Sequence, residues 1–70
     1  MNYTIKLKNK EEAERLVAAL EGVDGDVNLA YGSYVVDAKS LLGVLSVGLG
    51  RECTLSVPDG AYINFGGIIS

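Results

Sequence analysis

The sequence predicts one small α+β domain, and three observations carry this prediction. Its 70 residues suffice for a single domain at most. Apolar residues make up 49% of the chain and charged residues 21%, which is the balance of a folded globular protein and not of a disordered one. Segments with strand-like alternation are separated by two segments with helical spacing. We therefore expect the order strand, helix, strand, strand, helix, strand.

The first strand and the first helix are predicted from a change of hydrophobic period near residue 9. Residues 2–8 alternate between apolar and polar side chains, as a half-buried strand does. Asn9 suits a helix N-cap, and Glu12 stands three positions later in the place of a capping box. Gly22 is expected to end the helix. The apolar stripe between these signals consists of Ala13, Leu16, Val17 and Leu20.

A β-hairpin is expected next. Residues 27–31 and 34–36 read as two strands, and the pair Gly32-Ser33 between them has glycine first, as in a type II′ turn. After the hairpin, Ser40 is the expected N-cap of a short helix over 40–47. That helix is apolar nearly all round, which exceeds what one buried stripe needs.

The last element predicted with a clear pattern is a fourth strand over residues 53–57, where apolar and polar side chains alternate again. Pro58, Asp59 and Gly60 end it. Residues 61–70 have no helical period, and a short strand around Tyr62–Phe65 or a loose extension both fit them. We divide the chain into a domain over 1–57 and a short C-terminal tail over 58–70.

Composition excludes several classes of function. The net charge of −3 and a pI near 4.6 disfavour a nucleic-acid partner, and Lys6, Lys8 and Lys10 are followed at once by glutamates. The chain has no histidine and one cysteine, Cys53, so neither an internal disulfide nor a usual metal site is expected, and Cys53 fits buried packing. No cofactor is indicated either, because no glycine-rich phosphate loop precedes a helix.

The expected compartment is the cytoplasm. No apolar run approaches the roughly 20 residues of a membrane helix, so we expect no membrane insertion. The N-terminus lacks a basic start followed by an apolar stretch, so no signal peptide is expected.

Residues 26–57 resemble the regulatory half of the bacterial histidine-containing phosphocarrier protein (HPr). Two runs carry the resemblance: Asp-Val-Asn-Leu over 26–29, and the lysine-serine pair 39–40 that opens an apolar helix ending in an alternating glycine turn. The resemblance implies an open-faced β-sandwich, in which a four-stranded antiparallel sheet of order 1-4-2-3 carries its helices on one face. It also implies a protein of the phosphoenolpyruvate-dependent sugar phosphotransferase system.

The activity for which that family is named is not expected here. The family's phosphorylated histidine falls near Lys10 and its arginine near Glu12. A protonated lysine is not a nucleophile at neutral pH, and a glutamate repels the phosphate that an arginine would clamp. The usual C-terminal third helix is missing as well. This leaves apolar sheet surface that the tail or a second copy of the chain, as a homodimer, would cover.

The resemblance still implies a regulatory and docking surface. Ser40 matches the regulatory serine that an ATP-dependent kinase phosphorylates in Gram-positive bacteria, although a plain N-cap role also explains it. The helix that follows docks in the family onto Enzyme I, sugar-specific carriers and transcriptional regulators. Core packing and partner binding are both open for its leucines, which are Leu41, Leu42 and Leu45.

Three hypotheses follow. The first is a regulatory or protein-binding relative of HPr. The second is a phosphotransfer component that uses another residue. The third is a small structural or oligomerising domain. No enzyme constellation stands out, because the chain lacks a histidine for general-base work and a nucleophile elbow.

Overall fold

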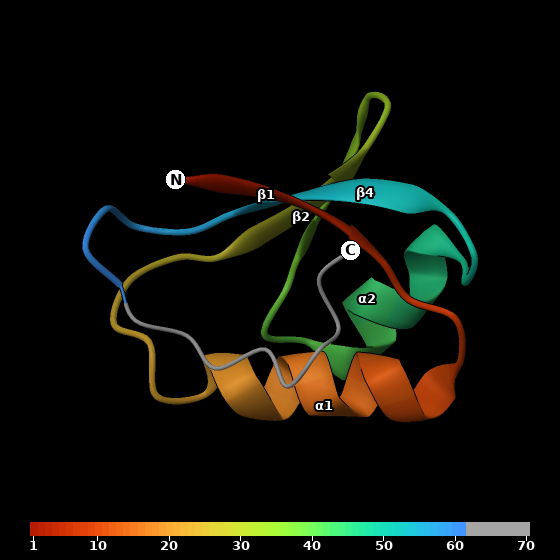
Figure 1. Cartoon of the computed structure of the whole chain (residues 1–70), viewed down its shortest axis with the longest axis horizontal. Helices are drawn as coiled ribbons and strands as arrows, with labels where there is room; N and C mark the ends of the chain where they lie inside the picture. The colour runs from red at the N-terminus through yellow and green to blue at the C-terminus, as the bar shows by residue number, and fades with distance from the viewer. Residues whose placement is uncertain (62–70) are drawn as a thin grey trace.

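The computed structural model describes residues 1–61, and within them the predicted element order is confirmed. A four-stranded antiparallel sheet has the order β1-β4-β2-β3. Both helices lie on the same side of this sheet (Figure 1). In chain order the elements are β1 (Asn2–Lys6), α1 (Lys10–Leu20), β2 (Asn28–Tyr31), β3 (Tyr34–Asp37), α2 (Leu41–Val47) and β4 (Glu52–Ser56).

The register of the sheet separates an apolar face from a polar one. Tyr3 pairs with Leu55, Leu55 with Leu29, and Leu29 with Val36, which gives one row of side chains across all four strands on the helix side. The neighbouring row on the other face begins with Thr4 and Thr54, which are exposed. Because the side-chain period of a strand is two, this pairing sends each strand's apolar residues toward the helices.

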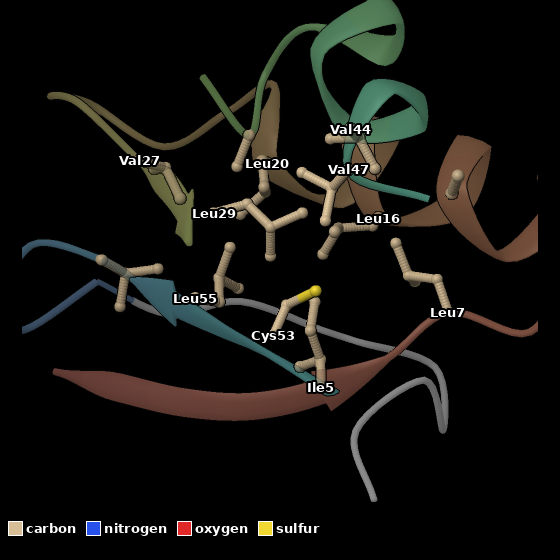
Figure 2. Packing of buried hydrophobic residues seen from close by; sticks show 13 residues of the cluster. Ile5, Leu7, Leu16, Leu20, Val27, Leu29, Val44, Val47, Cys53 and Leu55 are labelled. Carbon is tan, nitrogen blue, oxygen red and sulfur yellow. The ribbon is translucent and has the colours of Figure 1, made fainter. Parts of the chain in front are cut away.

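The core lies between the sheet and the two helices, as Figure 2 shows. The stripe of α1 is confirmed, since Ala13, Leu16 and Leu20 are buried and Val17 packs against them. The helix-facing side chains of β1 and β4 are also buried; these side chains are Ile5, Cys53, Leu55 and Val57. The residues predicted as a strand around 62–65, and the place of a third helix, lie outside the described residues.

The first helix begins and stops as predicted, but its C-terminal cap differs. Asn9 Oδ1 accepts a hydrogen bond from the Glu12 backbone N–H at 2.9 Å, which is the expected N-cap contact. At the other end Glu21 is the C-cap and Gly22 follows it, so the helix stops before Gly22 as predicted, though not through the left-handed conformation of a glycine cap. The helix ends at Leu20, Gly22 does not have a positive φ, and the chain leaves through a bond from the Val23 N–H to the Leu20 carbonyl.

The hairpin between β2 and β3 has the predicted two-residue turn. Tyr31 and Tyr34 are directly paired, so Gly32 and Ser33 are the two turn residues. Gly32 has a φ of 60°, while no residue other than glycine among 1–61 has a positive φ. This is the pattern of a type II′ turn, in which the first central residue alone needs the left-handed region.

The first strand was predicted to be longer than it is, because the alternation of apolar and polar side chains continues beyond the residues that pair with β4. Leu7 is buried, but the pairing of β1 with β4 ends at Lys6, opposite Glu52. Beyond it the Leu7 carbonyl accepts a single hydrogen bond from the Gly50 N–H at 2.7 Å.

Within residues 1–61 no helix is long and apolar enough to span a bilayer.

Gly43 sets how closely α2 approaches β3, and we expect Gly43→Ala to lower the free energy of unfolding by about 1 kcal/mol. A Cβ there would lie 3.1 Å from the Asp37 carbonyl oxygen, a backbone atom that cannot swing away. In an unobstructed helix the same change would stabilise by roughly 1 kcal/mol. Urea denaturation of the purified protein measures the difference.

The matched control is Gly22→Ala. Gly22 has no heavy atom within 4 Å of an added Cβ and no positive φ. We expect this variant to be more stable than wild type by about 0.4–1 kcal/mol, because alanine reduces the freedom of the unfolded chain. A Gly43→Ala protein that matches Gly22→Ala in stability would show that α2 does not need this close approach.

Candidate functional site

Ser40 is the N-cap of α2, as the sequence predicted. Its hydroxyl oxygen accepts a hydrogen bond from the Gly43 N–H at 3.2 Å, and its backbone is extended, with φ −100° and ψ 117°. Its own N–H donates to the Asp37 carbonyl at 3.1 Å. The half-buried hydroxyl is therefore held at the start of the helix, beside backbone N–H groups that have no partner inside α2.

The segment that leads to Ser40 is fixed on both sides. The Asp37 carboxylate accepts a hydrogen bond from the Lys39 N–H at 2.9 Å. The Lys39 Nζ donates to the Val23 carbonyl at 2.5 Å, in the connection between α1 and β2. The Asp37 side chain therefore stabilises the turn before Ser40, and the Lys39 side chain ties this turn to the loop between α1 and β2. Both bonds restrain the backbone that leads to Ser40.

The structure separates the three leucines proposed for partner binding. Leu42 is 81% exposed. Leu41 and Leu45 are partly buried and pack against the core. The face of α2 toward the sheet is occupied by Val44 and Val47, which are buried. Of the three leucines, Leu42 is therefore the one whose side chain is free for a partner.

The positions predicted for the family's histidine and arginine lie at the start of α1. Lys10 is the first residue of the helix and is exposed. Glu12 Oε1 accepts a hydrogen bond from the Lys8 N–H at 2.7 Å, and not from the Asn9 N–H as a capping box would have it. The Glu12 carboxylate thus accepts from a backbone N–H near the start of α1 that would otherwise be available to a bound anion. The local charge disfavours phosphate here.

Cys53 is part of the core, as the alternating sequence indicated. Its sulfur points into the apolar interior between Ile5 and Leu55 (Figure 2). Burial raises the pKa of the Cys53 thiol, and the positive charge of Arg51 offsets part of that rise. A raised pKa means less thiolate at neutral pH, and the thiolate is the reactive form. Cys53 is therefore unsuited to act as a nucleophile.

Three residues near α2 were not singled out from the sequence: Tyr31, Tyr34 and Arg51. The guanidinium carbon of Arg51 lies 4.9 Å from the centroid of the Tyr31 ring. The Tyr34 hydroxyl is 3.2 Å from Ser46 Oγ in α2. The signal for the tyrosines was present, because residues that flank a two-residue turn share one face. Arg51 carries no such local signal, since the pairing of β4 with β2 brings it near Tyr31.

Comparison with known proteins leaves the family of this chain open. No family model matches the chain, and no solved structure matches it. No group of three or more potential metal-ligating side chains occurs in the part of the chain that the structure describes. The candidate site is therefore defined by its own geometry, as a capped helix start with Ser40 and an exposed Leu42 on its first turn.

Proposed function

We propose that this chain is a regulatory or protein-binding relative of HPr in the bacterial sugar phosphotransferase system, acting in the cytoplasm, and not a histidine phosphocarrier. The sheet order β1-β4-β2-β3 with both helices on one face agrees with the architecture that the resemblance implies. The chain has no histidine. Its partners would be Enzyme I, a sugar-specific carrier, a serine kinase or a transcriptional regulator.

One juxtaposition supports this proposal most directly. Ser40 caps α2, and Leu42, two residues later, has 81% of its surface exposed. Leu42 is a candidate contact for a partner protein, because removing apolar surface from water favours association. A phosphate on Ser40 would add up to two negative charges beside this contact and would meet the free N–H groups of the first turn. Regulation and docking would therefore share one turn of helix.

We expect phosphoenolpyruvate and Enzyme I to leave the protein unlabelled, because neither Lys10 nor Glu12 can replace the family's histidine and arginine. A serine kinase of the HPr type with labelled ATP should instead label it on Ser40. Phosphate incorporation is measured by autoradiography, and the site is identified by mass spectrometry. An ordinary HPr from the same donor bacterium is the positive control for both reactions.

The serine substitution needs a variant that keeps the helix cap. Ser40→Asn removes the hydroxyl but retains a good N-cap, whereas Ser40→Ala would cost about 1 kcal/mol. Ser46→Ala is the matched control, because Ser46 lies in the same helix and is exposed. Labelling should disappear in Ser40→Asn and persist in Ser46→Ala. Acid-labile label from phosphoenolpyruvate, or kinase labelling that survives in Ser40→Asn, would contradict the proposal.

A further inference from the structure

The exposed large apolar side chains are concentrated on the hairpin and on α2 with the turn that follows it. The hairpin projects beyond the rest of the domain (Figure 1). Tyr34 is 51% exposed and Tyr31 41%, and both belong to the strands that flank its turn. On the helix side the corresponding residues are Leu42 at 81% and Leu49 at 41%. Apolar surface gathered in this way marks an interaction site more often than scattered single residues do.

Contacts join these residues into one surface. Tyr31 and Tyr34 are opposite each other across the hairpin, on the same face of the sheet. The Tyr34 hydroxyl contacts Ser46, which is one helical turn after Leu42 and therefore on the same side of α2. Arg51 lies over the ring of Tyr31. We call the group Tyr31, Tyr34, Leu42 and Arg51 the hairpin–α2 surface.

Arg51 gives this surface a positive charge that no carboxylate among the described residues pairs with. Within residues 1–61 the one ion pair is between the Met1 amino group and Asp59, so the Arg51 guanidinium has no carboxylate partner there. It also donates no side-chain hydrogen bond to any described residue. None of the described lysines and arginines forms an ion pair, so what distinguishes Arg51 is its position over the ring of Tyr31.

One contact favours a defined position of the Arg51 side chain before any partner binds. The face of the Tyr31 ring attracts the guanidinium, and Gly48 leaves room beside it, since a Cβ at Gly48 would lie 3.2 Å from Arg51 Nε. An arginine held in this way presents its planar set of N–H donors with less loss of freedom on binding. Carboxylates match that geometry with two parallel hydrogen bonds.

We propose that the hairpin–α2 surface binds a protein segment in which a carboxylate is flanked by aliphatic side chains. The carboxylate pairs with Arg51, and the aliphatic groups contact the tyrosine rings and Leu42. The tyrosines and the arginine of this surface belong to the residue types that are enriched at binding hot spots. The inference rests on the docking role proposed for α2, and it names the chemistry of the partner.

A selection with random peptides tests this chemistry without knowledge of the natural partner. Peptides displayed on phage are selected in parallel on the wild-type protein and on Arg51→Gln, and both pools are sequenced. We expect acidic residues next to leucine, isoleucine or valine to be enriched on wild type and not on Arg51→Gln. For a selected peptide, replacing its acidic residue by the amide should weaken binding to wild type about fivefold and binding to Arg51→Gln hardly at all.

The outcomes separate this inference from the proposed function. Tyr34→Ala should weaken the acidic peptide and its amide analogue equally, because it removes apolar contact and not charge. Absence of any peptide binding, or an acidic preference that persists in Arg51→Gln, would overturn the inference. If the peptides bind as expected while Enzyme I and the serine kinase do not bind, the inferred peptide-binding surface is supported and the proposed role in the phosphotransferase system is contradicted. The reverse result would refute the surface alone.

Discussion

We expect that replacing Leu42 with glutamate will weaken the proposed binding to the serine kinase or to Enzyme I by at least about tenfold, which is about 1.4 kcal/mol, and will leave the fold intact. The leucine is 81% exposed, so a carboxylate at this position remains in water and costs the free protein little. In the complex the same carboxylate would be buried against an apolar contact without a partner, which is costly. Isothermal titration calorimetry gives the loss of affinity, and urea denaturation gives the stability.

Two other variants make this result interpretable. Thr4→Glu adds the same charge at an exposed position on the opposite face of the sheet, in an edge strand, and should bind like wild type. Leu45→Glu would be a poor probe, because Leu45 packs against the core and its replacement would also destabilise the domain. If Leu42→Glu and Thr4→Glu bind equally well, α2 is not a docking surface.

The largest effect on stability is expected from Leu55→Ala, at about 2–5 kcal/mol. Leu55 has no exposed surface and lies in β4 between β1 and β2, where it pairs with Tyr3 and Leu29. Domains of this size are stable by about 0.05–0.15 kcal/mol per residue, so the loss is a large part of the total. Urea denaturation followed by circular dichroism measures it, and a mostly unfolded variant in buffer would also agree with the prediction.

Graded substitutions keep this second prediction testable if the alanine variant does not fold. Leu55→Met conserves volume and should cost less than about 1.5 kcal/mol. Leu42→Ala removes the same atoms from an exposed site and should change stability by no more than about 0.5 kcal/mol. If Leu55→Ala lost no more stability than Leu42→Ala, the burial of Leu55 between the sheet and the helices would be contradicted.

Local signals explain why the element order and several ends could be predicted. Asn9 and Ser40 cap their helices through their own side chains, and Gly32-Ser33 closes its hairpin with the expected φ. Each of these features depends on residues within four positions of one another. Where the end of an element depends on a distant strand, prediction was less accurate. Alternation continued through Leu7, although β4 has no residue to pair with it.

The candidate site was harder to predict for the same reason. A helix that is apolar on every side gives no hydrophobic stripe from which its rotation could be read. In the structure Gly43 lies against the Asp37 carbonyl of β3, Leu42 is exposed and Leu41 packs against the core, and none of these contacts is a local signal. The approach of Arg51 to Tyr31 likewise follows from strand pairing between distant parts of the chain.

The order of the strands has a consequence for how the domain emerges from the ribosome. β4 is the last strand of the chain that the structure describes, and it lies between β1 and β2. Until Glu52–Ser56 has been synthesised, β1 has no neighbour and the apolar face of β2 is incomplete. The nascent chain can form α1 and the hairpin by local contacts, but β1 joins the sheet only after β4 has emerged. Until that strand has emerged, the chain is open to chaperones and proteases.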